Sequence, residues 1–157
     1  MKIVSLIGNL SQHKTKRYKY RPLAAIRSIA IHHSATKSGS AEAFARYHVQ
    51  TLEWPGVGYH YVISKDGTVY KCHPLTLMTY HVGGSNREAV GICLVGDYDK
   101  EVPPDVQLEA AAELVKTLRS AFPWPLEVKR HGDYPGYKWK SCPGRRFPWP
   151  EFKALLR

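Results

Sequence analysis

Two apolar segments predict strands at the centre of a sheet. Ile29 and Ile31 alternate with smaller residues and lead directly into polar positions 32–36, as at the end of a strand. Residues 89–95 form a continuous apolar run, which is typical of a strand buried on both faces. A shorter segment at 126–130 predicts one more strand.

A hairpin is predicted between these segments. Residues 57–64 and 68–72 are rich in Tyr, Val and Ile, and the sequence Lys65-Asp66-Gly67 separates them. Asp-Gly favours a tight turn because glycine accepts a positive φ without steric cost. We therefore expect two neighbouring antiparallel strands here.

Two longer helices complete the pattern. Residues 41–52 follow Ser40, which is suited to an N-cap, and a second helix is expected from 103–105 to the prolines at 123 and 125. The apolar positions of this second helix share one face: Leu108, Ala111, Val115, Leu118 and Phe122. Residues 74–89 and 132–150 lack periodicity and are expected to be loops, with a last helical turn at 151–156. The order β-α-β-β-β-α-β predicts an α/β fold, a single domain with a central mixed β-sheet flanked by helices.

Composition is that of an ordinary globular domain. The chain has 157 residues, of which 43% are hydrophobic and 23% charged, enough for a real core and unlike a disordered chain. No apolar run approaches the roughly 20 residues of a membrane span, and the apolar start of the chain is too short for a signal peptide. Export by a signal peptide is therefore not expected.

The charge balance is strongly basic. The formal net charge is +10, which predicts a polyanionic partner such as nucleic acid or an anionic cell wall. Residues 13–21 hold five basic side chains and two tyrosines. This segment reads either as an anion-binding arm with stacking aromatics or as a solvated N-terminal extension.

A metal site is one interpretation of three polar residues. His32 and His131 each stand at the end of a predicted strand, and Cys142 follows in a loop rich in Gly and Pro. Two imidazoles and one thiolate leave one tetrahedral position open, as catalytic zinc requires. From spacing alone the alternative is two strand-end histidines and an unrelated thiol, and the neighbouring His33 is an alternative ligand to His32. The three cysteines are too few for a disulfide framework.

Five short motifs occur in a fixed order along the chain: Ile31-His32-His33-Ser34-Ala35-Thr36, residues 57–63 (VGYHYVI), residues 65–69 (KDGTV), residues 89–96 (AVGICLVG) and residues 140–144 (KSCPG). Together they resemble the zinc-dependent N-acetylmuramoyl-L-alanine amidases of type 2, a family that includes amidase-type phage lysozymes and peptidoglycan recognition proteins. The resemblance covers residues 26–152. It implies a catalytic domain at 26–157 and leaves 1–25 as a basic extension packed on it.

The resemblance implies roles for individual residues. One Zn²⁺ per chain is expected on His32, His131 and Cys142. Tyr59 is expected near the metal-bound water, and Lys140 facing the oxyanion that develops during hydrolysis. The family also has a loop His and Asn that line the substrate groove, and these fall on His81 and Asn86.

The implied activity is hydrolysis of the amide bond between N-acetylmuramic acid and L-alanine through a zinc-activated water. The expected partners are bacterial cell-wall peptidoglycan and, by charge, anionic wall polymers, with no specific nucleic acid and no membrane span; a monomer is expected. The resemblance to phage enzymes implies synthesis in a host cytoplasm and action on the wall after release. The alternatives are a non-catalytic peptidoglycan-binding module of the same fold, a nucleic-acid-binding protein, and an intracellular regulator, because some phage lysozymes of the family also bind a polymerase.

Overall fold

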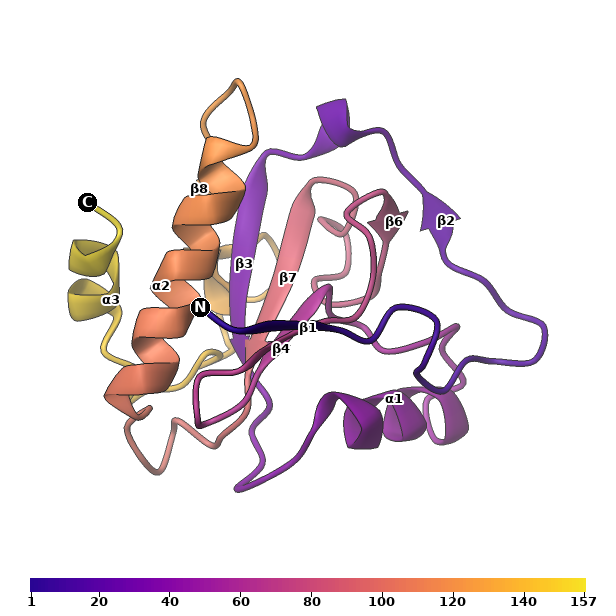
Figure 1. The fold of residues 1–157 in the computed structure, drawn as a ribbon, viewed down its shortest axis with the longest axis horizontal. Coiled ribbons are helices and arrows are strands. Elements are labelled where there is room, and N and C mark those ends of the chain that lie inside the picture. Colours follow the sequence, from indigo (N-terminus) through magenta and orange to yellow (C-terminus); the bar gives the residue numbers. More distant parts are fainter.

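A six-stranded mixed sheet runs through the centre of the computed structural model, which describes residues 1–157, with the strand order β1-β5-β4-β7-β3-β8 (Figure 1). Its strands are β1 (Ile3–Ser5), β3 (Ser28–His33), β4 (Tyr61–Ile63), β5 (Val69–Lys71), β7 (Ala89–Leu94) and β8 (Glu127–Arg130). The three central strands β4, β7 and β3 are parallel, β8 joins β3 in parallel, and β5 runs antiparallel to β4. This confirms the mixed sheet that the strand pattern predicts.

Helices cover both faces of this sheet. The helix α2 (Asp105–Ser120), with α3 (Trp149–Leu155) on its outer side, packs on one face (Figure 1). There Leu114 and Val115 of α2 join Ile31 and Ile92 of the sheet in the main core. On the opposite face the helix α1 (Ala41–Gln50) packs Ala41 and Ala45 against Val62 and Cys93, in a smaller core.

Alternation along β3 decides which side chains reach which face. Ile29 and Ile31 enter the core beneath α2, whereas Ala30 packs with a cluster on the other side. Since side chains alternate along a strand, His32 follows Ala30 to the face opposite α2, and His33 follows the isoleucines. The backbone amide of Tyr98, itself a member of the main core, donates to Nδ1 of His33 at 3.0 Å. The two adjacent histidines therefore point to opposite faces.

Most predicted elements are present, and the structure adds several short ones. The hairpin β4–β5 and both longer helices are confirmed, with ends that shift by a few residues. Residues 74–89 are not all loop, because β6 (Leu77–Met78) pairs there with β2 (Lys19–Tyr20). In residues 132–150 the expected loop begins within the 3₁₀ turn η2 (His131–Asp133) and ends at the start of α3; a second such turn, η1 (Leu23–Ala25), precedes β3. The strands β1, β2 and β6 have two or three residues each, too few for a periodic pattern, and unlike β4 and β5 they are not joined by an Asp-Gly turn that marks them in the sequence.

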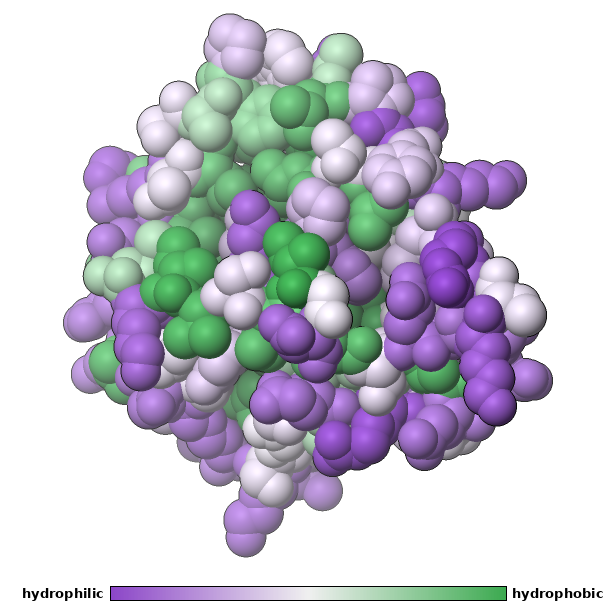
Figure 2. Space-filling view, turned by 45° about the vertical axis from the view of Figure 1, so that its right-hand side comes forward, coloured by the Kyte–Doolittle hydropathy of each residue, from purple (hydrophilic) through white to green (hydrophobic).

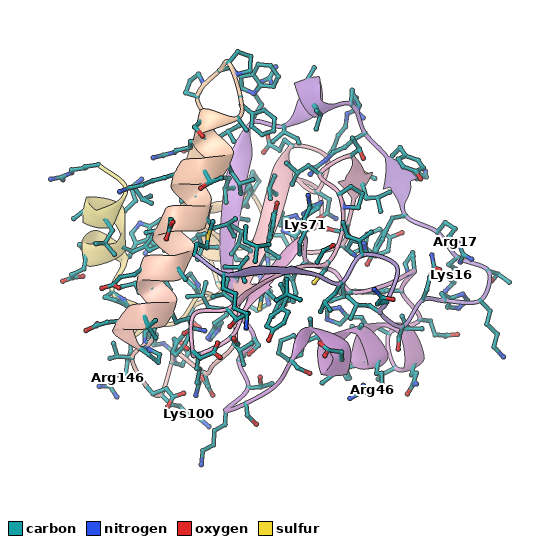
Figure 3. The ribbon with its side chains drawn as sticks, viewed as in Figure 1. Lys16, Arg17, Arg46, Lys71, Lys100 and Arg146 are labelled. Carbon is teal, nitrogen blue, oxygen red and sulfur yellow. The ribbon has the colours of Figure 1, made fainter.

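The segment 13–21 is not a uniformly solvated arm. Lys16 and Arg17 lie on its projecting loop (Figure 3), but Tyr18 and Arg21 are buried. The guanidinium of Arg21 donates to the carbonyl oxygens of Leu75, Asn86, Arg87 and Ala89 at 2.8–3.1 Å. The expectation of an exposed basic residue is wrong at this position, because the loop ahead of β7 needs donors for its inward-facing carbonyl groups.

The surface is mixed in character. Figure 2 shows hydrophobic residues gathered in the upper part of one face, with hydrophilic residues around its lower rim. The labelled cations in Figure 3 are spread around the molecule, with Arg46 on α1 well apart from Lys100 and Arg146. No helix combines the length and the apolar character needed to cross a membrane.

Candidate metal centre and active site

Three donor atoms converge at the carboxyl ends of two neighbouring parallel strands. His32 lies near the end of β3, and His131 directly follows β8, so both rings reach the same edge of the sheet. Nδ1 of His32 lies 3.1 Å from Nδ1 of His131 and 3.8 Å from Sγ of Cys142. One ligand atom from each residue lies within 4.8 Å of the others, and all three side chains are buried.

These separations fit a tetrahedral zinc ion. With Zn–N near 2.05 Å and Zn–S near 2.3 Å, tetrahedral ligands stand roughly 3.3 Å apart for two nitrogens and roughly 3.6 Å for nitrogen and sulfur. The distances of 3.1 and 3.8 Å between the donors are close to these values. A set of two imidazoles and one thiolate suits zinc and leaves one coordination position for water or substrate. The residues present therefore fit the metal that the sequence predicts.

The tautomer of His32 is fixed by a second histidine. Nε2 of His81 lies 3.1 Å from the carbonyl oxygen of Ala89, which can only accept, so this nitrogen carries the proton. Nδ1 of His81 is then an acceptor, and Nε2–H of His32 donates to it over 3.0 Å. Burial lowers the pKa of His32 well below 6.5 and that of His81 to about 3, so both rings are neutral. The lone pair of His32 Nδ1 therefore faces the other two candidate metal ligands, His131 and Cys142.

A tight local arrangement holds His81 in place. The carbonyl of Ala89 also accepts from the guanidinium of Arg21, at 2.8 Å. Gly91 leaves room for the ring, because a Cβ atom at this position would lie 2.7 Å from Cγ of His81. The side-chain oxygen of Asn86 accepts from the backbone amides of His81 and Val82 at 3.0 and 2.7 Å, which closes the turn that carries the ring.

The loop that carries Cys142 is held in place by Asp99. The carboxylate of Asp99 accepts from the backbone amide of Arg145 at 2.8 Å and from the hydroxyl of Ser141 at 3.0 Å, on either side of Cys142. Gly144 has a φ of +120° and passes so close to Tyr98 that a Cβ would lie 2.3 Å from the Tyr98 carbonyl carbon. Only glycine fits there, which explains its place after Cys-Pro.

The thiol of Cys142 requires a cation to ionise. Burial raises its pKa to about 12, and the backbone amide of His33 and the Lys140 ammonium only partly oppose this shift. Burial likewise lowers the pKa of His131 to about 4, so this ring is neutral. Its buried Nε2 has no hydrogen-bond partner in the protein. A metal that binds these residues therefore displaces the thiol proton.

A pocket of about 220 Å³ opens over the three donors. Its lining residues are His32, His33, Ser34, Ala35, Trp54, Tyr59, Tyr80, His81, His131, Lys140 and Cys142. Tyr59 lies beside the metal centre, with its ring centroid 5.3 Å from that of His32. Burial and the neighbouring Cys93 and Cys142 thiols raise the pKa of Tyr59 well above 10, so its phenol stays protonated. Lys140 also lines the pocket and contributes a positively charged ammonium group to its wall.

The structure thus brings together most of the residues that the sequence singled out. His32, His131, Cys142, Tyr59 and Lys140 share one pocket. His81 lies in its wall with both ring nitrogens hydrogen-bonded inside the protein, and Asn86 supports the same turn. A direct contact of these two residues with substrate stays a prediction.

Sequence reasoning missed two supporting residues. In the sequence, Arg21 is one of several basic residues in the segment 13–21, and Asp99 lies in a polar stretch after the apolar run 89–95. Each acts through backbone groups far along the chain, 54–68 residues away for Arg21 and 46 residues for the amide that Asp99 accepts. No local pattern encodes such contacts.

Comparison with known proteins agrees with this geometry. The sequence profile of the family described as N-acetylmuramoyl-L-alanine amidase matches residues 21–145. An endolysin of Enterobacteria phage K11 is 31% identical over 121 residues, covering 72% of this chain and 77% of the phage protein. Peptidoglycan recognition protein 1 of Bos indicus is 30% identical over 132 residues, covering 82% of this chain and 70% of its own length. The solved N-acetylmuramoyl-L-alanine amidase LysC from Clostridium intestinale URNW superposes with a TM-score of 0.78 at 28% identity, covering 99% of this chain and 97% of LysC.

Proposed function

The chain belongs to the family of N-acetylmuramoyl-L-alanine amidases, and on this premise we propose that it is a zinc-dependent peptidoglycan hydrolase of the endolysin type. Its substrate is the amide bond between the lactyl group of N-acetylmuramic acid and the L-alanine of the stem peptide. The relatives named as endolysins and amidases support a hydrolase acting on peptidoglycan.

One observation carries the proposal. Nδ1 of His32 lies 3.1 Å from Nδ1 of His131 and 3.8 Å from Sγ of Cys142, close to the separations of tetrahedral zinc ligands, and the pocket over the three residues is open on one side. When bound there, zinc would polarise the scissile carbonyl and lower the pKa of a coordinated water towards 7. A closed structural site would need a fourth protein ligand, and the cluster contains three.

The chain's own residues supply binding and charge. Lys140 lies in the pocket wall, where its ammonium stabilises the negative charge that develops on the carbonyl oxygen. Tyr59 lines the same pocket, and we assign its phenol, kept protonated by burial, as a hydrogen-bond donor to the substrate. The aromatic rings of Trp54 and Tyr80, which meet edge to face, also line the pocket, and we assign them to positioning the substrate.

The test is product analysis on purified peptidoglycan, with and without a chelator. Mass spectrometry is expected to find stem peptides that begin with L-alanine, released only without chelator and restored by zinc. Glycan fragments cut between sugars, or release that persists in the chelator, would contradict the proposal.

The same experiment separates the alternative of a recognition module. Peptidoglycan recognition proteins are among the relatives, so binding without cleavage is the second candidate. Such a module would sediment with the wall and release no new amino termini under either condition. Action on the wall after release from a host cytoplasm, and a monomeric state, belong to the same proposal.

A further inference from the structure

A second cleft opens beside the metal centre. It has a volume of about 550 Å³, against about 220 Å³ for the pocket over the donors, and Lys140 and Cys142 line both. Its other walls come from the end of β8, the loop between η2 and Cys142, and the start of α3. The cleft is therefore adjacent to the pocket over the metal ligands.

The cleft carries an excess of positive charge. Four basic side chains line it, Arg130, Lys138, Lys140 and Arg145, against the single carboxylate of Asp133. Arg130 is neutralised, because its Nε and Nη2 donate to the two oxygens of Asp133 at 3.0 and 2.9 Å.

The remaining three cations have no carboxylate partner. None of Lys138, Lys140 and Arg145 takes part in an ion pair, and none of their side-chain nitrogens donates a hydrogen bond within the protein. The Lys140 ammonium lies 5.4 Å from the centroid of the Trp139 ring, a cation–π contact that leaves its charge unneutralised. The nearby carboxylate of Asp99 is already used by the Ser141 hydroxyl and the Arg145 backbone amide. Three cations without a carboxylate partner around one cleft attract an anion of the ligand more strongly than scattered surface charges do, since a cleft concentrates their electrostatic field.

We propose that this cleft binds an anionic oxygen group, carboxylate or phosphate, carried by the wall polymer next to the scissile amide. The inference rests on the proposed function, because it takes the ligand in the neighbouring pocket to be peptidoglycan. The stem peptide supplies carboxylates, and teichoic acid attached to the glycan supplies phosphodiesters. Arg145 suits either group, since a guanidinium binds both in bidentate fashion.

The experiment measures binding of two probes that the enzyme cannot cleave. The first is a free stem peptide with its carboxylates intact, and the second is a short glycerol phosphate oligomer. Dissociation constants are measured by calorimetry at low and at physiological salt for the wild type and for Lys138→Ala/Arg145→Ala. The matched control, Arg46→Ala/Lys116→Ala, removes two exposed cations from α1 and α2. Zinc content of each variant checks that the site remains folded.

The cleft variant is expected to weaken binding of at least one probe about tenfold, and the control less than about twofold. The probe that responds identifies the source of the anion. Equal weakening by both double variants, or no binding of either probe to the wild type, would overturn the inference. If the wild type binds a probe but releases no stem peptide from the wall, the result would support the anion site in the cleft and contradict the proposed hydrolase activity.

Discussion

Nε2 of His32 lies 3.0 Å from Nδ1 of His81, and this contact sets the proton on the far side of the His32 ring from the other two donors. Because Nε2–H of His81 donates to the carbonyl of Ala89, Nδ1 of His81 must accept from His32. When both rings are neutral, each therefore carries its proton on Nε2. His32 thus presents its lone pair to a metal before the metal arrives. A ring that must choose its tautomer on binding would hold the ion less firmly.

Removing this support should weaken zinc binding. His81→Ala is expected to lower zinc affinity by about 10–100-fold, because His32 loses the acceptor that orients it. Gly91→Ala should act in the same direction, since its Cβ would displace the His81 ring. Competition with a chromophoric chelator measures both affinities. Wild-type zinc affinity in His81→Ala, with the fold intact by circular dichroism, would show that the contact is incidental.

The thiol is expected to be indispensable for the metal. Cys142→Ser should lose most of the bound zinc and most of the activity, because a neutral hydroxyl is a poor ligand compared with a thiolate. Metal analysis after gel filtration, together with peptidoglycan hydrolysis, tests this. Cys93→Ser is the matched control, since Cys93 is also buried but is absent from the donor cluster. Equal zinc loss in both variants would point to misfolding rather than to a lost ligand.

Lys140 and Tyr59 should affect rate and not metal content. Lys140→Ala is expected to keep one zinc per chain and to lower kcat by about 10²–10³-fold, the usual cost of one group that stabilises an oxyanion. Tyr59→Phe should retain zinc as well and lose rate through the missing hydroxyl. Paired zinc assays and kinetics on a soluble muropeptide distinguish these effects. A Lys140→Ala enzyme with unchanged kcat and a raised KM would assign the ammonium to substrate binding alone.

Arg21 is expected to stabilise the active-site loop as well as the fold. Arg21→Met removes the guanidinium donor from four carbonyl groups, of which the Ala89 carbonyl keeps the His81 Nε2–H, and this loss is expected to lower the free energy of unfolding by about 3 kcal/mol or more. Zinc affinity should fall too, since the Ala89 carbonyl shared with His81 loses a partner. Urea unfolding and zinc titration measure the two effects. Arg17→Met, which alters an exposed arginine of the same segment, should change neither.

Acid should destabilise the metal-free protein. Burial lowers the pKa of His48 and of His131 to about 4, whereas both take a proton near pH 6.5 in the unfolded chain. Between these values the unfolded chain binds more protons, so stability is full above pH 6.5 and falls as the pH drops towards 4. Urea midpoints of chelator-treated protein at pH 7, 5.5 and 4.5 should decrease in that order. A constant midpoint would mean that these rings stay exposed enough to titrate normally.

The sequence predicts the three candidate metal ligands better than the residues that hold them in position. His32, His131 and Cys142 can be found because the motifs around them resemble a family and because strand ends meet at one sheet edge. Arg21 and Asp99 act on backbone groups distant in the chain, and neither lies in a recognisable motif. The length of α2 follows from its periodic face, whereas β1 and β2 depend on partners that no local pattern reveals.

The opposite orientation of His32 and His33 has a consequence for insertions and deletions. A one-residue deletion early in β3 would turn His33 toward the pocket and still present an imidazole there, yet it would also bring Ile29 and Ile31 out of the core under α2. An imidazole would still face the pocket after this replacement of His32 by His33, but the loss of the two isoleucines from the core would destabilise the fold. The burial of Ile29 and Ile31 under α2 therefore determines which of the two adjacent histidines faces the pocket as the proposed ligand. A shift of the β3 register is expected to destabilise the fold in addition to changing the site.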